Sequence, residues 1–537
     1  MKKLIYIGIM AGSLLLNSSC SDWLDLLPKN EQVTDAYWKS KEDVEAVIAS
    51  GYYYMRSSCQ SLLKWGELRG ASICTLTGDK DGMKLQNFQL DGTEAICKWE
   101  NMYQVINMAN VVIAHAPGVR EIDDTYTEGA MNAHLSEAYF MRALMYFYLV
   151  RNFKEVPLVT TPYEDDSTPF SIAKSSEEEI LKQIKADVQT ALDSGGAKEF
   201  YDNDNWNASK GRATKWALYA LMSEVSLWTE DYDTCIKYAD LLINATASRR
   251  PAFITIPENW YTIFNPGNSN ESIFEVNWDG NTYSQTGGPS AMYTTGTNPN
   301  YRYSTKMGED LVNDFEEVMA GKDAIRSQFG AFIAYTDGEN IVHCIWKYEM
   351  GDTDPTNPDA IRLKDDANWI IYRMADVMLM KAEALIWKGK ENWQEAVDII
   401  NQIRTRANLP EKTIALDEED ESSMMENYLL PERNIELAAE GKRWYDMIRY
   451  AKSKNYAHKS AFIALVQQYN TTANASWIRS VLQNEYAWYL PIHADEIENN
   501  NLLVQNPYYG ITAIYEDFRK YIFIIIGCII QCMQRSL

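Results

Sequence analysis

The sequence predicts a mainly helical fold that is interrupted by a long, loop-rich region. Apolar residues recur at spacings of three and four in several long segments, which is the pattern of helices with one buried face. Two of these segments are helical hairpins whose sequences resemble each other. Between the hairpins, residues 247–366 contain few helical patterns, and Glu271 to Trp278 have the pattern of a strand.

The N-terminal part of the chain contains three of the predicted helices. The first begins after Ser40, a residue type that caps helix N-termini well. Residues 61–93 are rich in glycine and polar side chains and are expected to form a loop. A hairpin follows over about residues 94–153. Its first helix is expected to end at Pro117-Gly118, because these two residue types favour a helix terminus.

Two further hairpins are predicted at residues 212–244 and 368–408. Within them, Ser223 to Trp228 aligns with Ala382 to Trp387, and an aromatic residue starts the helix that follows each segment. Small residues let two helices approach, and aromatic residues fill the space between hairpins, as in tetratricopeptide repeats. Residues 455–510 are expected to be irregular. Four tryptophans at packing positions are assigned to the core: Trp228, Trp387, Trp393 and Trp444.

The N-terminus has the features of a secretory signal. Lys2 and Lys3 precede an apolar run over residues 4–16, and small polar residues then lead to Cys20. The apolar run is shorter than the roughly 20 residues that span a bilayer. The segment before Cys20 resembles a bacterial lipobox, which implies a signal peptide over residues 1–19 and acylation of this cysteine. The alternative is an ordinary signal peptide with an incidental cysteine.

Composition and motifs exclude several classes of function. The chain has 50 Lys+Arg and 75 Asp+Glu, so its formal net charge of -25 argues against a nucleic-acid partner. Seven cysteines besides Cys20 cannot all pair within one chain, and no CxxC motif or other metal-ligand spacing occurs. We therefore expect no metal and no cofactor. No catalytic motif is present either, and the strand–helix alternation of a barrel enzyme is absent, so no enzymatic activity is expected.

Several motifs occur in the order found in one known family. Pro431 to Arg449 closely matches the ER…EL…EG.RW.DL.R signature of RagB/SusD proteins. Further matches are YR.ADVLLMKAEA at Tyr372 to Ala384, EAYFLRAL at Glu137 to Leu144, GRATK at Gly211 to Lys215, and the closing Val504 to Pro507. The chain therefore resembles the RagB/SusD family over roughly residues 20–508.

This resemblance implies a fold, a location and partners. The fold would be a mainly α, SusD-like domain over residues 20–508, with short strands in an irregular ligand-binding region inserted at about 247–366. Its scaffold would be four tetratricopeptide-like hairpins, at about 94–153, 212–244, 368–408 and 425–452. The protein would be surface-exposed on the outer membrane, lipid-anchored through Cys20, and would bind an oligo- or polysaccharide as the lid of a SusC-like TonB-dependent transporter.

The most motif-rich segment is expected to be scaffold rather than a catalytic site. Its charged residues and tryptophan would form a buried cluster of ion pairs and hydrogen bonds near the transporter-facing side, because opposite charges three or four residues apart on a helix pair with each other. The residues are Glu432, Arg433, Glu440, Arg443, Trp444 and Asp446.

A glycan site needs exposed aromatic rings beside hydrogen-bonding side chains. The loop after residue 277 offers the best candidates: Trp278, Asn281, Tyr283, Tyr293, Tyr301, Arg302 and Tyr303. The segment 61–93 offers a second set: Trp65, Arg69, Asp79, Lys80 and Asn87. The alternative for each aromatic residue is packing on the scaffold, and a core position is favoured for Trp99.

Two other functions are alternatives to glycan capture. A surface protein that binds peptides or proteins is compatible with tetratricopeptide-like hairpins, and a glycoside hydrolase is the less favoured alternative.

Residues 509–537 extend beyond the usual end of the family, and Tyr521 to Ile530 are strongly apolar but too few to span a membrane. We expect this extension to be a sequence accident; the alternative is that it packs against the body or the transporter.

Overall fold

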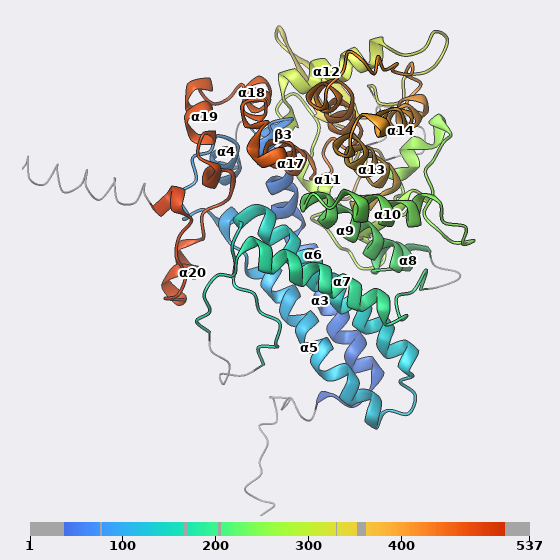
Figure 1. The fold of residues 1–537 in the computed structure, drawn as a ribbon, viewed down its shortest axis with the longest axis vertical. Helices are drawn as coiled ribbons and strands as arrows, with labels where there is room; N and C mark the ends of the chain where they lie inside the picture. The colour runs from blue at the N-terminus through green and yellow to red at the C-terminus, as the bar shows by residue number, and fades with distance from the viewer. Residues whose placement is uncertain are drawn as a thin grey trace, which may run out of the picture.

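The computed structural model describes residues 37–75, 78–164, 170–201, 206–328, 330–351 and 361–510. The signal peptide at 1–19, Cys20 and the apolar extension after residue 510 lie outside these described residues. Helices dominate the structure and the strands are short, so the prediction of a mainly α fold is confirmed (Figure 1). Within the described part of the chain, no helix is both long enough and apolar enough to cross a bilayer.

The N-terminal helices pack side by side (Figure 1). They are α3 (Lys41–Glu67), α5 (Glu100–Ile122), α6 (Glu128–Phe153) and α7 (Glu177–Asp193). Ser40 caps α3 in a capping box with Asp43, as its sequence position predicts. Helix α5 continues through Pro117, so the predicted end at that residue is wrong; the proline removes one backbone hydrogen bond without ending the helix. Helix α7, also started by a capping box, was missed.

The two similar hairpins lie next to each other in space. The first consists of α9 (Lys215–Trp228) and α10 (Tyr232–Ile243), preceded by the short α8 (Trp206–Gly211), and the second of α13 (Met374–Lys388) and α14 (Trp393–Arg406). Helix α10 packs directly on α13, so segments about 140 residues apart in sequence form one helical layer. The core positions predicted for Trp228, Trp387 and Trp393 are confirmed, because all three are buried.

The segment 425–452 is less regular than a simple hairpin. The three-residue α15 (Glu421–Ser423) leads into a π-helical stretch, η6 (Met424–Leu429), then α16 (Leu430–Glu436), a turn, and α17 (Arg443–Tyr456). Gly441 adopts the left-handed region at φ +80° in this turn. The turn contacts α3 so closely that a Cβ atom on Gly66 would lie 2.1 Å from the carbonyl oxygen of Gly441.

In the described residues, the strands of the loop-rich region and two strands outside it, β1 and β6, form three separate two-stranded sheets. The strand β1 (Ile73–Thr75) pairs with β3 (Tyr301–Tyr303), β2 (Ser272–Val276) with β6 (Trp369–Arg373), and β4 (Phe332–Asp337) with β5 (Asn340–Ile345); all three pairs are antiparallel. The strand predicted at 271–278 is therefore present. Between the strands lie three short helices: η4 (Pro257–Ile263), α11 (Pro289–Met292) and α12 (Thr305–Glu316).

Two segments predicted to be irregular contain short helices instead. In the segment 61–93, α3 extends to Glu67 and is followed by η2 (Leu68–Gly70), β1 and α4 (Lys80–Gln86), with η3 (Ala95–Cys97) just beyond. After residue 456 come α18 (Lys459–Tyr469), α19 (Ala475–Leu482), η7 (Glu485–Trp488) and α20 (Ala494–Asn499). Most of these helices are too short to show helical periodicity, and side-chain caps such as Asp79 and Asn474 start them.

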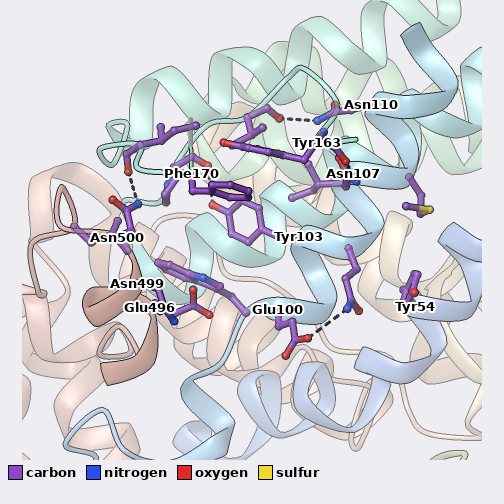
Figure 2. Close-up of a pocket in the computed structure, with 18 residues that line it drawn as sticks. Tyr54, Glu100, Tyr103, Asn107, Asn110, Tyr163, Phe170, Glu496, Asn499 and Asn500 are labelled. Atoms are coloured by element: carbon purple, nitrogen blue, oxygen red, sulfur yellow. Dashed lines mark hydrogen bonds between the residues drawn. The ribbon is translucent and has the colours of Figure 1, made fainter. Parts of the chain in front are cut away.

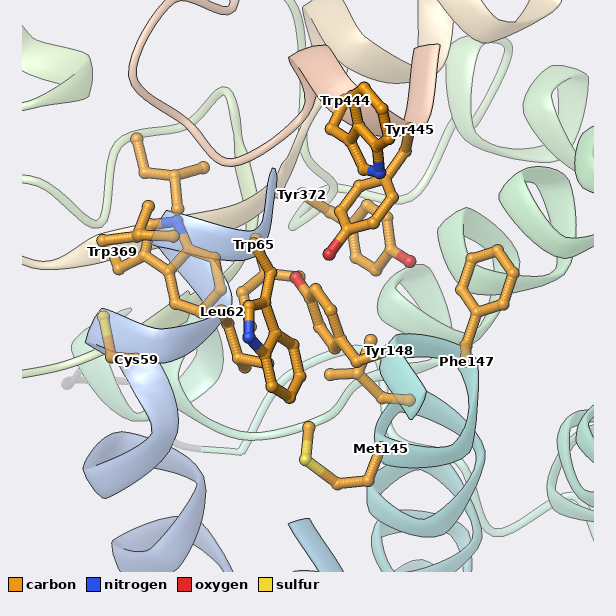
Figure 3. Packing of buried hydrophobic residues seen from close by; sticks show 14 of the residues in the cluster. Cys59, Leu62, Trp65, Met145, Phe147, Tyr148, Trp369, Tyr372, Trp444 and Tyr445 are labelled. Carbon is orange, nitrogen blue, oxygen red and sulfur yellow. The ribbon is translucent and has the colours of Figure 1, made fainter. Parts of the chain in front are cut away.

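The main hydrophobic core lies where α3, α6, β6 and α17 meet (Figure 3). Trp65, Tyr148, Trp369 and Tyr445 come from these four elements and are each buried. Trp444, also predicted as core, is fully buried beside them. Aromatic residues thus fill the junction between the N-terminal helices and the later hairpins, and they account for part of the Tyr and Trp content of the chain.

The predicted buried cluster of charges is confirmed, but most of its partners come from other elements. Arg433 pairs with Asp446 at 2.8 Å and with Asp376 at 3.0 Å. Glu432 pairs with Arg326 at 2.7 Å, and Glu440 with Arg373 at 2.8 Å. Arg443 instead lies over the ring of Tyr469. The cluster therefore links α16 and α17 to α13, to β6 and to the segment around Arg326, rather than stabilising a single helix.

Candidate functional site

A pocket of about 460 Å³ opens between α5, residues 157–163 and 170–172, and the C-terminal residues around α20 (Figure 2). Five aromatic side chains line it: Tyr54, Trp99, Tyr103, Tyr163 and Phe170. Its polar lining consists of amides and acids: Glu100, Gln104, Asn107, Asn110, Glu496, Asn499 and Asn500. A concave surface of aromatic rings with a few polar groups is typical of ligand sites.

The aromatic residues of the pocket differ in how much surface they present. Trp99 precedes the first residue of α5 and is only 3% exposed; its ring packs edge-on against Tyr103 and Phe153. Phe170 is 65% exposed and lies nearly parallel to Tyr163, with ring centroids 5.9 Å apart. Trp99 therefore forms part of the floor, as its predicted core position implies, whereas Tyr163 and Phe170 offer accessible faces.

Asparagine side chains on α5 fasten the wall of the pocket. Asn107 donates from Nδ2 to the carbonyl oxygen of Tyr163 at 3.0 Å and accepts from the N–H of the same residue at 2.7 Å. Asn110 donates to the carbonyl oxygens of Val159 and Thr161, both at 3.1 Å. These amides replace the backbone pairing that a strand would supply, so the segment that carries Tyr163 is held against α5.

The remaining polar groups are only partly paired. Gln104 donates from Nε2 to Glu100 at 3.4 Å, and Asn500 donates to the carbonyl oxygen of Ile172 at 2.8 Å. The Oε1 atom of Gln104 is buried and has no hydrogen-bond partner within the described structure. Glu100 is exposed and Glu496 half-buried at the mouth of the pocket. Burial raises the pKa of Glu496, the nearby charge of Glu100 raises it further, and a hydrogen bond from Trp99 opposes this change.

The structure buries two of the residues predicted from segment 61–93. Trp65 is fully buried and its indole donates to the carbonyl oxygen of Ile96. Arg69 is 2% exposed, donates to the carbonyl oxygen of Trp488 and lies over the ring of Trp444. The expected exposure of Trp65 and Arg69 is therefore wrong, because α3 and η2 carry both side chains into the core.

Four of the aromatic residues predicted on the loop 278–303 are also buried: Trp278, Tyr293, Tyr301 and Tyr303. Tyr293 follows α11 and stacks on Tyr348, with ring centroids 5.7 Å apart. Tyr301 and Tyr303 face inward from β3. The expected exposure of these four rings is wrong, because short elements fold the predicted loop back onto the core.

The other predicted residues lie at or near the surface. Tyr283 is 72% exposed, and Asn281 accepts a hydrogen bond from Lys364. Lys80 is exposed, whereas Asn87 and Arg302 are half-buried. None of the glycan contacts predicted from the sequence lines the pocket in Figure 2.

The two predicted candidate segments nevertheless come together in space. The antiparallel pairing of β1 with β3 joins them, with Cys74 opposite Arg302. Asp79 caps α4, pairs with Lys64 at 2.9 Å and accepts a hydrogen bond from Tyr301. These two segments thus lie next to each other, and neither contributes a residue to the lining of the pocket.

Tyr163 and Phe170 are the functional candidates that the sequence analysis missed. They lie in a polar, proline-containing segment between two helices, which is where exposed aromatic residues are expected. Aromatic residues in a polar connection between two helices are a sequence signal that could have identified both as site candidates. Within the described residues, no group of three or more His, Cys, Asp or Glu side chains is placed to hold a metal ion.

Comparison with known proteins gives the family. The sequence profile of the SusD family matches residues 345–509. A second profile, described as "Starch-binding associating with outer membrane", matches residues 22–227. The resemblance to the RagB/SusD family is confirmed. This SusD-like chain is matched on both sides of its loop-rich region, so the helical parts carry most of the family's sequence pattern.

Individual relatives of this SusD-like chain are distant but cover most of its length. It is 26% identical to the SusD-like protein P38 of Formosa agariphila, over 82% of this chain and 90% of that protein. It is 24% identical to a SusD-like protein of Bacteroides ovatus, over 82% of each.

Solved structures show the same fold. A SusD superfamily protein from Bacteroides thetaiotaomicron matches with a TM-score of 0.69 at 21% identity, over 88% of this chain and 99% of that one. A structure named "Laminarin binding SusD-like protein" matches with a TM-score of 0.63 at 21% identity, over 88% of this chain and 100% of that one. The fold is therefore that of the SusD superfamily.

Proposed function

We propose that this SusD-like chain is a cell-surface lipoprotein that captures an oligo- or polysaccharide. The observation that carries the proposal is the pair of stacked, accessible rings, Tyr163 and Phe170, above a pocket with amide and acid groups. Sugar rings present apolar C–H faces and a rim of hydroxyl groups, which match aromatic faces and polar side chains respectively. The names of the family profile and of one structural relative support a glycan as the ligand.

The proposal includes a location and a partner. Acylation of Cys20 would anchor the chain in the outer membrane, and the bound glycan would be delivered to a SusC-like TonB-dependent transporter, with this chain as its lid. The family profile that names the outer membrane supports this location. Substitution of Cys20 by Ala should release the protein from the membrane fraction, and the wild-type protein should copurify with a TonB-dependent transporter.

Retention in gels that contain polysaccharide tests the binding itself. Full-length protein in a nonionic detergent is run through gels with neutral or acidic polysaccharides. We expect retardation by at least one of them, and Tyr163→Ala should weaken it up to about tenfold, since an aromatic contact contributes about 0.5–1.5 kcal/mol. The control is Leu416→Ala, an exposed residue outside the pocket. Retardation by no polysaccharide, with retention of a peptide library instead, would favour a peptide-binding function.

One observation supports a second candidate, a glycoside hydrolase. Such enzymes place two carboxyl groups at the scissile bond, and the pocket has Glu100 and Glu496, the latter with a raised pKa. Binding without turnover is the better proposal, because no catalytic motif accompanies these acids. The two functions are distinguished by incubating the protein with the polysaccharide that retards it in the gel. New reducing ends with the wild-type protein, and none with Glu496→Gln, would establish the hydrolase.

A further inference from the structure

We infer that the pocket selects glycans without carboxylate or sulfate groups. This inference rests on the proposed function and names the class of ligand. It follows from the charges around the pocket. Among the described residues that line it, the charged side chains are both acidic, Glu100 and Glu496, and none is Lys, Arg or His.

Three basic residues close in sequence to the lining lie next to acids. Lys98, the residue before Trp99, has its Nζ atom 2.9 Å from a carboxylate oxygen of Asp495. His493 lies 3.5 Å from the same carboxylate. His115, near the segment that carries Tyr163, contacts Glu164 at 2.9 Å. An anionic sugar would therefore have to displace an acid to pair with any of these three residues.

Neutral sugars can donate hydrogen bonds to the same two acids. A carboxylate accepts hydrogen bonds and cannot donate them, so it matches a hydroxyl group and repels another carboxylate or a sulfate. Glu496 is half-buried, where this repulsion is screened less than in bulk water. The formal charge of -25 on the whole chain adds a long-range field that opposes the approach of polyanions.

A matched series of polymers tests the inference. The neutral polysaccharide that retards the full-length protein most is compared with its carboxymethyl ether and its hydroxyethyl ether, at about 20 mM salt so that screening is weak. We expect the carboxymethyl form to bind at least about fivefold more weakly than the hydroxyethyl form, since one unit-charge pair at 4 Å contributes about 1 kcal/mol even in water. The hydroxyethyl form controls for bulk.

Variants assign the effect to the two acids. The double variant Glu100→Gln/Glu496→Gln should reduce the difference between the ethers by about half or more, and the part that remains comes from the charge on the rest of the chain. Glu498→Gln, an exposed residue on α20 outside the pocket lining, should leave the difference intact.

Either of two results with the ethers would overturn the inference while the proposed function stands: equal binding of both, or an unchanged difference in the double variant. Preferential binding of an acidic polysaccharide by the wild-type protein would do the same. If no polysaccharide binds at all, the proposed function itself fails and the inference fails with it.

Discussion

The carboxylate of Glu67 accepts a hydrogen bond from the backbone N–H of Gly441 at 2.6 Å, across 374 residues of sequence. It also accepts one from the N–H of Lys442 at 3.3 Å. Glu67 ends α3, and the two donors lie in the turn between α16 and α17. The N-terminal helix and the segment richest in family motifs are therefore joined directly, and changes at this junction should affect the whole core.

Gly66→Ala should destabilise the protein strongly. The new Cβ would lie 2.1 Å from the carbonyl oxygen of Gly441, so α3 and the turn would have to separate. We expect a loss of about 3 kcal/mol or more in the free energy of unfolding, measured by urea denaturation. Gly118→Ala in α5 is the control. A Cβ there meets no atom within 4 Å, so this change should stabilise the protein by up to about 1 kcal/mol. Equal stability of the two variants would show that the junction can open freely.

Glu67→Gln should make stability less dependent on pH. Burial raises the pKa of Glu67 from 4.5 to about 8. The folded state thus holds this proton more tightly than the unfolded chain, so stability is greatest below the unfolded pKa and falls as the pH rises to about 8. Glutamine keeps an acceptor oxygen and cannot ionise, so the variant should lose less stability between about pH 5 and about pH 9. The measurement is the free energy of unfolding across this pH range, with Glu42→Gln, an exposed residue on α3, as the control. The expectation is contradicted if the pH dependence of stability in Glu67→Gln matches that of the control and of the wild type.

Arg373→Met should cost about 3–5 kcal/mol of stability, because it leaves three buried acids without a shared partner. Arg373 contacts Glu271 at 2.9 Å, Glu436 at 2.6 Å and Glu440 at 2.8 Å. Chemical denaturation measures the loss. The matched control is Lys390→Met, which removes a surface pair with Asp417 and should leave the unfolding midpoint nearly unchanged. A small effect for Arg373→Met would mean that water reaches the cluster.

Phe170→Ala should weaken glycan binding several-fold, whereas Tyr283→Ala should not. The two rings are similarly exposed, at 65% and 72%, but only Phe170 lines the pocket. Gel retention with the same polysaccharide measures both. The reverse result would move the glycan site to the loop 278–303 that the sequence favoured, because Tyr283 is its one strongly exposed tyrosine among those predicted.

The helical scaffold could be predicted from sequence because its signals are local. Ser40 caps α3 as expected, and the hairpin of α13 and α14 follows a regular apolar spacing. Helix ends were harder to predict, since Pro117 does not end α5. The short helices after residue 456 depend on caps and on packing against distant residues, which periodicity does not report.

The candidate site could not be predicted in the same way, because exposure is a tertiary property. Tyr293 and Tyr301 lie in a sequence typical of a loop, yet α11 and β3 turn their rings inward. Trp99 has the spacing of a core residue and is buried, yet it also lines the pocket. The pocket itself joins α5 to α20, elements nearly 400 residues apart in sequence, and no local pattern links them.

The paired hydrogen bonds of Asn107 have a consequence for how relatives of this chain can diverge. Its side chain both donates to and accepts from the backbone of Tyr163. Aspartate has the same shape but no N–H to donate, and it would place its charge against a carbonyl oxygen. The aromatic residues of the wall can therefore change with the ligand, while asparagine at position 107 is expected to persist wherever this wall is kept. Residues that contact the ligand would vary between relatives, whereas the asparagine that holds their backbone in place would be conserved.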